Sequence, residues 1–164
     1  MPPTATLPTR DSLIQAGDTA PDFTLLDQNR SEWTLSEAAA KGPVVLCFYP
    51  LAFTGVCSTE MECVQKEFSR WTEGGAQVVG VSCDSFATQN AWAEQMGFKQ
   101  PLLADMHRAV CKAYGLYWGD LNVSSRGTVV VEHADGQLKV VWSQSREPGD
   151  AMNFDEVLTA AMNA

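Results

Sequence analysis

The chain of 164 residues lacks several features that would point to particular classes of protein. It has only 11 lysines and arginines against 20 aspartates and glutamates, and this net charge of −9 argues against binding to nucleic acid or to anionic membranes. No hydrophobic run approaches the roughly 18–20 residues that a membrane-spanning helix needs. The N-terminal residues have neither a charged start nor a hydrophobic core, so we expect no secretory signal and a cytoplasmic protein.

Cysteine pairs and metal-ligand motifs are also missing. Five cysteines, an odd number spread over hydrophobic segments, make a poor disulfide framework and fit a reducing compartment; they are Cys47, Cys57, Cys63, Cys83 and Cys111. The absence of a Cys-x-x-Cys pair disfavours a dithiol–disulfide reductase. His107 and Cys111 stand four residues apart on an expected helix, but no second ligand pair has suitable spacing. We therefore expect neither a metal nor a cofactor.

What the chain does contain is an alternation of hydrophobic strands and amphipathic helices. Residues 44–49 and 77–82 are typical of buried strands, and residues 56–73 between them have helical spacing, which predicts a parallel pair with a right-handed crossover. Further elements are expected as follows: a short helix capped by Ser36, a helix over 86–97 capped by Asp84 or Ser85, a helix over 106–114, a hairpin of 128–132 and 137–142, and a C-terminal helix opened by Asn153.

These elements predict one domain. Residues 1–14, with three prolines, indicate a flexible N-terminal arm, and residues 15–164 form the domain. The expected fold class is α/β, with a central mixed sheet and helices on both faces.

Cys57 has the most informative position in the chain. It follows the strand 44–49, which ends at Pro50, and it falls in the first turn of the expected helix 56–73. Unpaired N–H groups and the positive end of the helix dipole gather at such a place. A nucleophilic cysteine reacts as the thiolate, and a helix N-terminus contributes only about 0.3–1 kcal/mol, up to about 2 when partly buried. Thr54 is placed to donate a hydrogen bond to the sulfur, and an arginine is expected nearby.

The pattern Pro50-x-x-x-Thr54-x-x-Cys57, followed by Glu60, resembles the active-site signature of the peroxiredoxins, thiol peroxidases with a thioredoxin-like fold. Residues 17–23, 79–84 and 126–128 resemble three further segments of that family, the last of which carries its active-site arginine. The resemblance covers about residues 15–160. Order and spacing are most similar to the alkyl hydroperoxide reductase E type, which is described as a one-cysteine peroxiredoxin.

The resemblance implies an antioxidant enzyme that reduces hydrogen peroxide and organic hydroperoxides. Cys57 would attack the peroxide and become a sulfenic acid, which a low-molecular-weight thiol, thioredoxin or a glutaredoxin-like protein reduces. Arg126 would stabilise the thiolate and bind peroxide oxygens, with Thr54 as a second donor. Pro50 would shield the cysteine, and Glu60 would orient the arginine. A homodimer is also implied.

Two alternatives remain open at this point. The same fold and cysteine suit a peroxide sensor or redox relay, and a second cysteine of this chain would serve as a resolving partner for Cys57. Cys83 is the best placed, because it ends the neighbouring strand on the same side of the sheet as Cys57. Cys63 lies six positions along the helix, about 240° around it. The position of Cys111 is not fixed by the sequence, and Cys47 is expected in the core.

Overall fold

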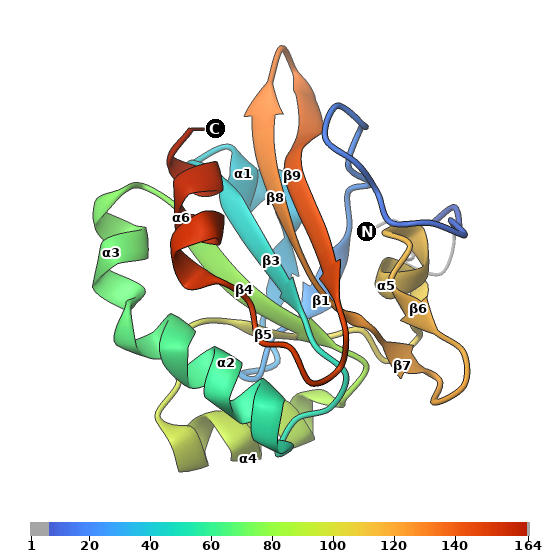
Figure 1. Ribbon diagram of the computed structural model, residues 1–164, viewed down its shortest axis with the longest axis vertical. Helices are drawn as coiled ribbons and strands as arrows, with labels where there is room; N and C mark the ends of the chain where they lie inside the picture. Colours follow the sequence, from blue (N-terminus) through green and yellow to red (C-terminus); the bar gives the residue numbers. More distant parts are fainter. Residues whose placement is uncertain (1–6, 164) are drawn as a thin grey trace.

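A seven-stranded mixed sheet forms the centre of the computed structural model, which describes residues 7–163 (Figure 1). Its strand order is β2-β1-β5-β4-β3-β8-β9. The strands are β1 (Thr24–Leu26), β2 (Glu32–Thr34), β3 (Val44–Phe48), β4 (Gln77–Ser82), β5 (Leu102–Ala104), β8 (Arg126–Ala134) and β9 (Gln137–Arg146). A separate two-stranded sheet contains β6 (Tyr117–Trp118) and β7 (Val123–Ser124). Strands β3, β4 and β5 are parallel, whereas β8 runs antiparallel to β3.

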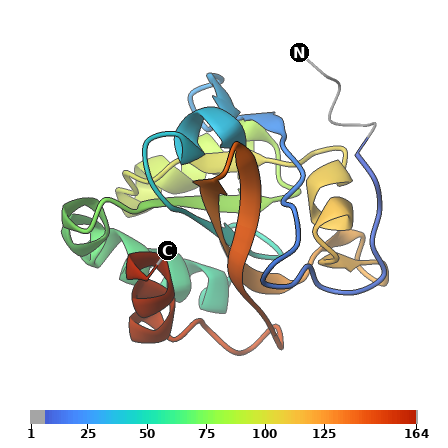
Figure 2. The same ribbon diagram turned by 90° about the horizontal axis from the view of Figure 1, so that it is seen from above.

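Helices cover both faces of this sheet, so the predicted fold class is confirmed. On one face, Leu46 and Phe48 of β3 pack with α1 (Leu35–Ala39) and α5 (Ala109–Ala113). On the other face, Cys47 and Tyr49 pack with the four remaining helices, α2 (Gly55–Lys66), α3 (Phe68–Glu73), α4 (Phe86–Met96) and α6 (Phe154–Met162). Figure 2 shows α1 and α6 on opposite sides of the sheet. The alternation of side chains along a strand produces these two cores.

Several helices begin or end at residues other than those predicted. The expected helix 56–73 is divided into α2 and α3 at Glu67, whose φ of −98° and ψ of 14° are not helical. The expected helix 106–114 is shortened to α5, because the Asp105 carboxylate accepts the N–H groups of Val110 and Cys111. Ser36 is not a cap, since α1 begins one residue before it, at Leu35.

Other boundaries agree with the sequence. The Ser85 side chain accepts a hydrogen bond from the Thr88 N–H at the start of α4, and Asn153 accepts one from Glu156 at the start of α6. Asp135 and Gly136 both have positive φ, as a tight turn between β8 and β9 requires. No helix among residues 7–163 is both long enough and hydrophobic enough to cross a bilayer.

The end of the expected N-terminal arm lies against α5. The Arg10 N–H donates to the Lys112 carbonyl at 3.0 Å, and the Ile14 N–H donates to the Tyr114 carbonyl at 3.1 Å. The Ile14 side chain is fully buried. Residues 7–14 are thus packed on the domain in this structure, residues 1–6 lie outside the described residues, and the division at residue 14 stays a prediction.

Candidate active site

Cys57 lies in the first turn of α2, immediately beyond the loop that follows β3 (Figure 1). Cys57, Glu60, Met61 and Val64 are the buried residues of this helix, and their spacing of three and four places them on one face. That face packs on the sheet, so the Cys57 side chain points toward it and is only 1% exposed.

Arg126 supplies the cation that the position of Cys57 calls for. It is the first residue of β8, on the same face as Thr128 and Val130, and it is 2% exposed. Its Nη2 atom donates to the Cys57 Sγ atom at 2.9 Å and its Nη1 atom donates to the Glu60 carboxylate at 3.2 Å. Its Nε–H donates to the Pro148 carbonyl at 3.1 Å. These three bonds fix the guanidinium plane beside the sulfur.

Glu60 has a fully buried carboxylate that joins three parts of the chain. Besides Arg126, it accepts hydrogen bonds from the Met152 N–H at 2.8 Å and from the Arg146 guanidinium at 3.4 Å. The same Arg146 group donates to the Thr128 hydroxyl at 2.8 Å. The glutamate therefore orients two arginines and holds the segment before α6 against α2.

Arg146 is a site residue that the sequence analysis did not identify. It pairs with Arg126 across the β8–β9 hairpin. A register counted outward from the turn at Asp135 and Gly136 would place Ser145 opposite Arg126 instead. A bulge between Val130 and Val131 shifts the pairing by one residue. The only sign of this residue in the sequence was an arginine near the end of the second strand of the expected hairpin.

Thr54 does not donate to the sulfur in this structure. Its hydroxyl donates to the Leu51 carbonyl at 2.7 Å, which closes the loop before α2. Its backbone is extended, as at a helix N-cap, but its side chain makes no capping bond. Pro50 is buried next to Tyr49 at the end of β3. The expected direct Thr54–Cys57 hydrogen bond is thus replaced by one within the loop.

Asp84, which the sequence offered with Ser85 as a possible helix cap, instead anchors the loop before Cys57. Its carboxylate accepts the Ala52 N–H at 2.9 Å and the Ser82 hydroxyl at 2.7 Å. The end of β4 is thereby tied to the loop that leads into Cys57. An acidic residue just after the strand next to β3 was the signal for such an anchor.

Of the remaining cysteines, Cys47 lies where it was predicted and Cys83 does not. Cys47 is buried in the core as predicted, and burial raises the pKa of its thiol, with the Glu60 carboxylate as a second cause. Cys63 is exposed. The side of the sheet predicted for Cys83 is wrong: Cys57 belongs to the core of α2 and α4, whereas Cys83 packs against the opposite core. The reason is that successive side chains at the end of β4 alternate between the two faces.

Cys111 is the neighbour of Cys83 in the structure. The two Sγ atoms are 3.8 Å apart, and Cys111 is fully buried in α5. Cys83, Asp105 and Cys111 form the one group of possible metal ligands found among residues 7–163, and His107 does not belong to it.

A cavity of about 600 Å³ adjoins the cluster of arginines. It is lined by Trp118, Ser125, Arg126, Ser145, Arg146, Glu147, Pro148 and Asp150. Arg126 thus connects this space to the buried Cys57 sulfur. The cavity has charged groups on the hairpin side and an aromatic wall from β6.

Comparisons with known proteins show the family to which the chain is similar. Residues 16–141 match the model of the AhpC/TSA family. The chain is 35% identical over 140 residues to alkyl hydroperoxide reductase E of Mycobacterium tuberculosis, covering 84% of this chain and 90% of that protein. It is 36% identical over 137 residues to peroxiredoxin-2 of Mus musculus, covering 77% and 68%. The crystal structure of peroxidoxin BcpB from Mycobacterium tuberculosis superposes with a TM-score of 0.80 at 32% identity, covering 92% of this chain and 97% of that chain.

Proposed function

Because this chain belongs to the AhpC/TSA family of peroxiredoxins and is a thiol-dependent peroxidase, we propose that Cys57 is the residue that attacks the peroxide. The observation that carries this assignment is the 2.9 Å hydrogen bond from Arg126 to the Cys57 sulfur. The cluster contains two buried guanidinium groups, those of Arg126 and Arg146, and one carboxylate, that of Glu60. One positive charge is therefore left over, and a Cys57 thiolate balances it. Buried charges need such pairing, since taking them out of water is costly.

The proposed reaction begins with the Cys57 thiolate, which attacks the terminal oxygen of the hydroperoxide in line with the O–O bond. The O–O bond breaks, the alkoxide or hydroxide leaves and takes up a proton, and Cys57 becomes a sulfenic acid. Arg126 donates to the peroxide oxygens as charge develops on them. The Thr54 hydroxyl, once it turns away from Leu51, is the second donor. Pro50 shields the sulfur, and Glu60 holds Arg126 in place.

Both hydrogen peroxide and alkyl hydroperoxides are proposed as substrates. The 600 Å³ cavity beside Arg126 is larger than hydrogen peroxide requires, and Trp118 offers a hydrophobic surface to an alkyl chain. A peroxide entering here meets Arg126 before it reaches Cys57. The name of the mycobacterial relative, alkyl hydroperoxide reductase E, supports the second substrate class.

We propose a one-cysteine cycle with an external reductant. Support comes from the placement of the other thiols: Cys63 is exposed on the same helix, and Cys83 and Cys111 contact each other in the opposite core. One external thiol condenses with the Cys57 sulfenic acid and releases water, and a second thiol releases Cys57 from this mixed disulfide. The reductant is a low-molecular-weight thiol, thioredoxin or a glutaredoxin-like protein.

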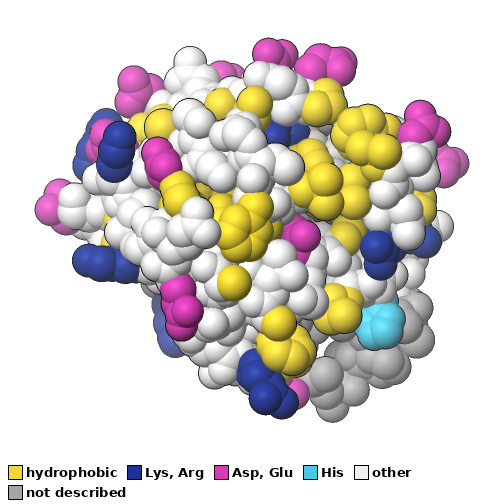
Figure 3. Space-filling model, turned by 90° about the horizontal axis from the view of Figure 1, so that it is seen from below, with side chains coloured by type: hydrophobic (Ala, Val, Ile, Leu, Met, Phe, Trp, Pro, Cys, Tyr) yellow, Lys and Arg dark blue, Asp and Glu magenta, His cyan; other side chains and the backbone are white. Residues whose placement is uncertain are grey.

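We also propose that the protein is a homodimer and that it is located in the cytoplasm. Several groups of hydrophobic side chains lie on the face shown in Figure 3. The exposed large hydrophobic residues include Leu51, Phe53, Met106, Tyr117 and Leu121. Hydrophobic surface of this kind favours contact with a second copy. The five free cysteines fit a reducing compartment. Sedimentation analysis of the reduced protein tests the dimer, and cell fractionation tests the location.

The experiment that tests the proposed function is intact-mass spectrometry of the reduced protein after one equivalent of hydrogen peroxide. We expect a gain of one oxygen, captured on Cys57 by a sulfenic-acid trap, and no such gain in Cys57→Ser. An external thiol should then restore the original mass over repeated cycles, whereas a relay would transfer its oxidation to one client protein. An unchanged mass after peroxide would exclude Cys57 as the peroxidatic residue.

A further inference from the structure

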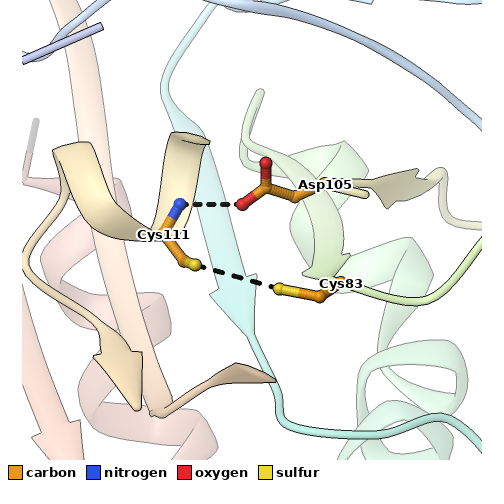
Figure 4. A group of neighbouring side chains, drawn as sticks. All are labelled: Cys83, Asp105 and Cys111. Carbon is orange, nitrogen blue, oxygen red and sulfur yellow. Dashed lines mark hydrogen bonds between the residues drawn. The ribbon is translucent and has the colours of Figure 1, made fainter. Parts of the chain in front are cut away.

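We propose that Cys83 and Cys111 form a second redox pair, which closes to a reversible disulfide on the face of the sheet opposite Cys57. The two residues come from different elements: Cys83 follows β4, and Cys111 is the third residue of α5 (Figure 4). This site is separate from the peroxidatic centre, because the two lie in the opposite cores described above.

The distance between the two sulfurs is the first observation that favours a disulfide. The Sγ atoms are 3.8 Å apart in the thiol state, and Figure 4 shows the two side chains pointing toward each other. A disulfide needs about 2.05 Å between the sulfurs, which small side-chain rotations can approach. Both residues also lie where the backbone can adjust, because Cys83 is beyond the end of β4 and α5 has only five residues.

Exposure sets the order of the reaction. Cys83 is partly exposed, whereas Cys111 is fully buried. An oxidant from solvent therefore reaches Cys83 first. The pKa of the Cys111 thiol is raised by its contact with Cys83, by burial and by the nearby Asp105 carboxylate. Cys111 thus remains a thiol until Cys83 has been oxidised.

The oxidant that we assign to this pair is a hydroperoxide, the substrate class of the enzyme. The Cys83 thiolate attacks the peroxide, the O–O bond breaks, and the alcohol leaves with the former thiol proton, so that Cys83 is a sulfenic acid. The Cys111 sulfur then attacks the Cys83 sulfur, and hydroxide leaves with the Cys111 proton as water. Asp105, whose carboxylate is within 4.8 Å of both sulfurs, is the base at hand for this proton. In sum, two thiols and one hydroperoxide give one disulfide, one alcohol and one water, and two external thiols reverse the change.

A bound divalent metal is the competing explanation for this group. Three features favour the disulfide instead. Both Asp105 oxygens already accept backbone N–H groups, from Val110 at 3.1 Å and from Cys111 at 2.8 Å. The Arg108 guanidinium also interacts with the Asp105 carboxylate and opposes a second cation there. Among residues 7–163 only three ligands come together here, whereas a closed structural zinc site has four.

The test uses the full chain with Cys57→Ser, so that its outcome does not depend on the proposed role of Cys57. The reduced variant is treated with excess hydrogen peroxide, and its mass and tryptic peptides are analysed without reduction. We expect the loss of two hydrogens, a peptide linking Cys83 to Cys111, and full reversal by dithiothreitol. Adding Cys63→Ser should leave this result unchanged, whereas adding Cys83→Ser should abolish it.

Three results would overturn the proposal. The first is a Cys57→Ser protein that has reacted with hydrogen peroxide but yields no peptide linking Cys83 to Cys111. The second is a loss of two hydrogens that persists after Cys83→Ser. The third is binding of one zinc ion per chain, in a titration of the reduced protein, that protects the pair from peroxide. The first result does not depend on the folding of a variant that lacks Cys83 or Cys111, so the proposal stays open to refutation if those variants fail to fold.

Discussion

Arg126 and Arg146 stand directly opposite each other across the β8–β9 hairpin, and both guanidinium groups bind the carboxylate of Glu60. Like charges at opposed positions of a hairpin repel each other, and here the repulsion would act in a buried place. The glutamate from α2 offsets it. The geometry of Arg126 beside Cys57 thus depends on a residue that does not itself touch the sulfur.

Replacing Glu60 with glutamine should therefore weaken both the fold and the reaction. Glu60→Gln leaves two buried guanidinium groups without their shared counter-charge, and we expect a loss of about 3 kcal/mol in the free energy of unfolding. Since Arg126 also loses a fixed orientation, Cys57 oxidation should slow by about tenfold or more. Urea denaturation and stopped-flow kinetics with hydrogen peroxide measure the two effects. Glu62→Gln, the same change in the same helix, is the control, and an unchanged oxidation rate in Glu60→Gln would remove Glu60 from the site.

The anchor between Asp84 and the Ala52 N–H makes a separate prediction. Asp84→Ala removes the acceptor for this N–H, and Ala52 is buried, so we expect a loss of about 1–2 kcal/mol in stability. The loop before Cys57 should become more mobile, and peroxide oxidation of Cys57 should become slower. Hydrogen exchange at Ala52 reports the loop directly. The control is Asp120→Ala, at an exposed position. Unaltered exchange at Ala52 would show that other contacts hold the loop.

Much of this arrangement could be predicted from local patterns. The hydrophobic run 44–49, the change to helical spacing after Gly55 and the Asp135-Gly136 turn each specify their element by short-range physics. Cys57 follows from the first two, because a strand followed by a helix places the first turn of that helix at the sheet edge. Arg126, 69 positions away, came from the resemblance to a family, since nothing local distinguishes it from a surface arginine.

What could not be predicted depends on register and on tertiary contacts. The bulge at Val130 and Val131 moves Arg146 opposite Arg126, and no residue type in that stretch demands a bulge. The face occupied by Cys83 changes with a shift of one residue at the end of β4, because side chains alternate there. The cap of α5 comes from Asp105, several residues before the first helical turn, so its start could not be read from the helical spacing.

The glycine at position 115 should be essential for attaching the N-terminal segment. Its φ is +74°, and a Cβ atom there would lie 1.9 Å from the Ser12 carbonyl oxygen. Gly97 has a similar φ of +72° but open space around the same position. Gly97→Ala should thus cost about 1–2 kcal/mol for the backbone alone. Gly115→Ala should cost about 3 kcal/mol or more and should expose residues 10–14 to proteolysis. Equal losses in the two variants would mean that the segment does not pack at Gly115.

Asp105 predicts a specific dependence of stability on pH. Burial raises the pKa of its carboxyl above the ordinary value of 3.8, while the N–H groups of Cys111 and Val110 act in the opposite direction. The folded protein then holds the proton more tightly than the unfolded chain. The stability contributed by this protonation is complete below about pH 3.8 and is lost as the pH rises through the folded pKa.

Asp105→Asn removes the titration, so the wild-type protein should lose stability relative to this variant as the pH rises from about 4 toward 7. The change amounts to about 1.4 kcal/mol for each unit by which the pKa is raised. Urea denaturation of both proteins across this range measures it. Asp120→Asn, at an exposed position, should differ from the wild-type protein by a nearly constant amount. A wild-type protein that gained stability over Asp105→Asn with rising pH would mean that the two N–H hydrogen bonds outweigh burial, and that Asp105 caps α5 as a carboxylate throughout this range.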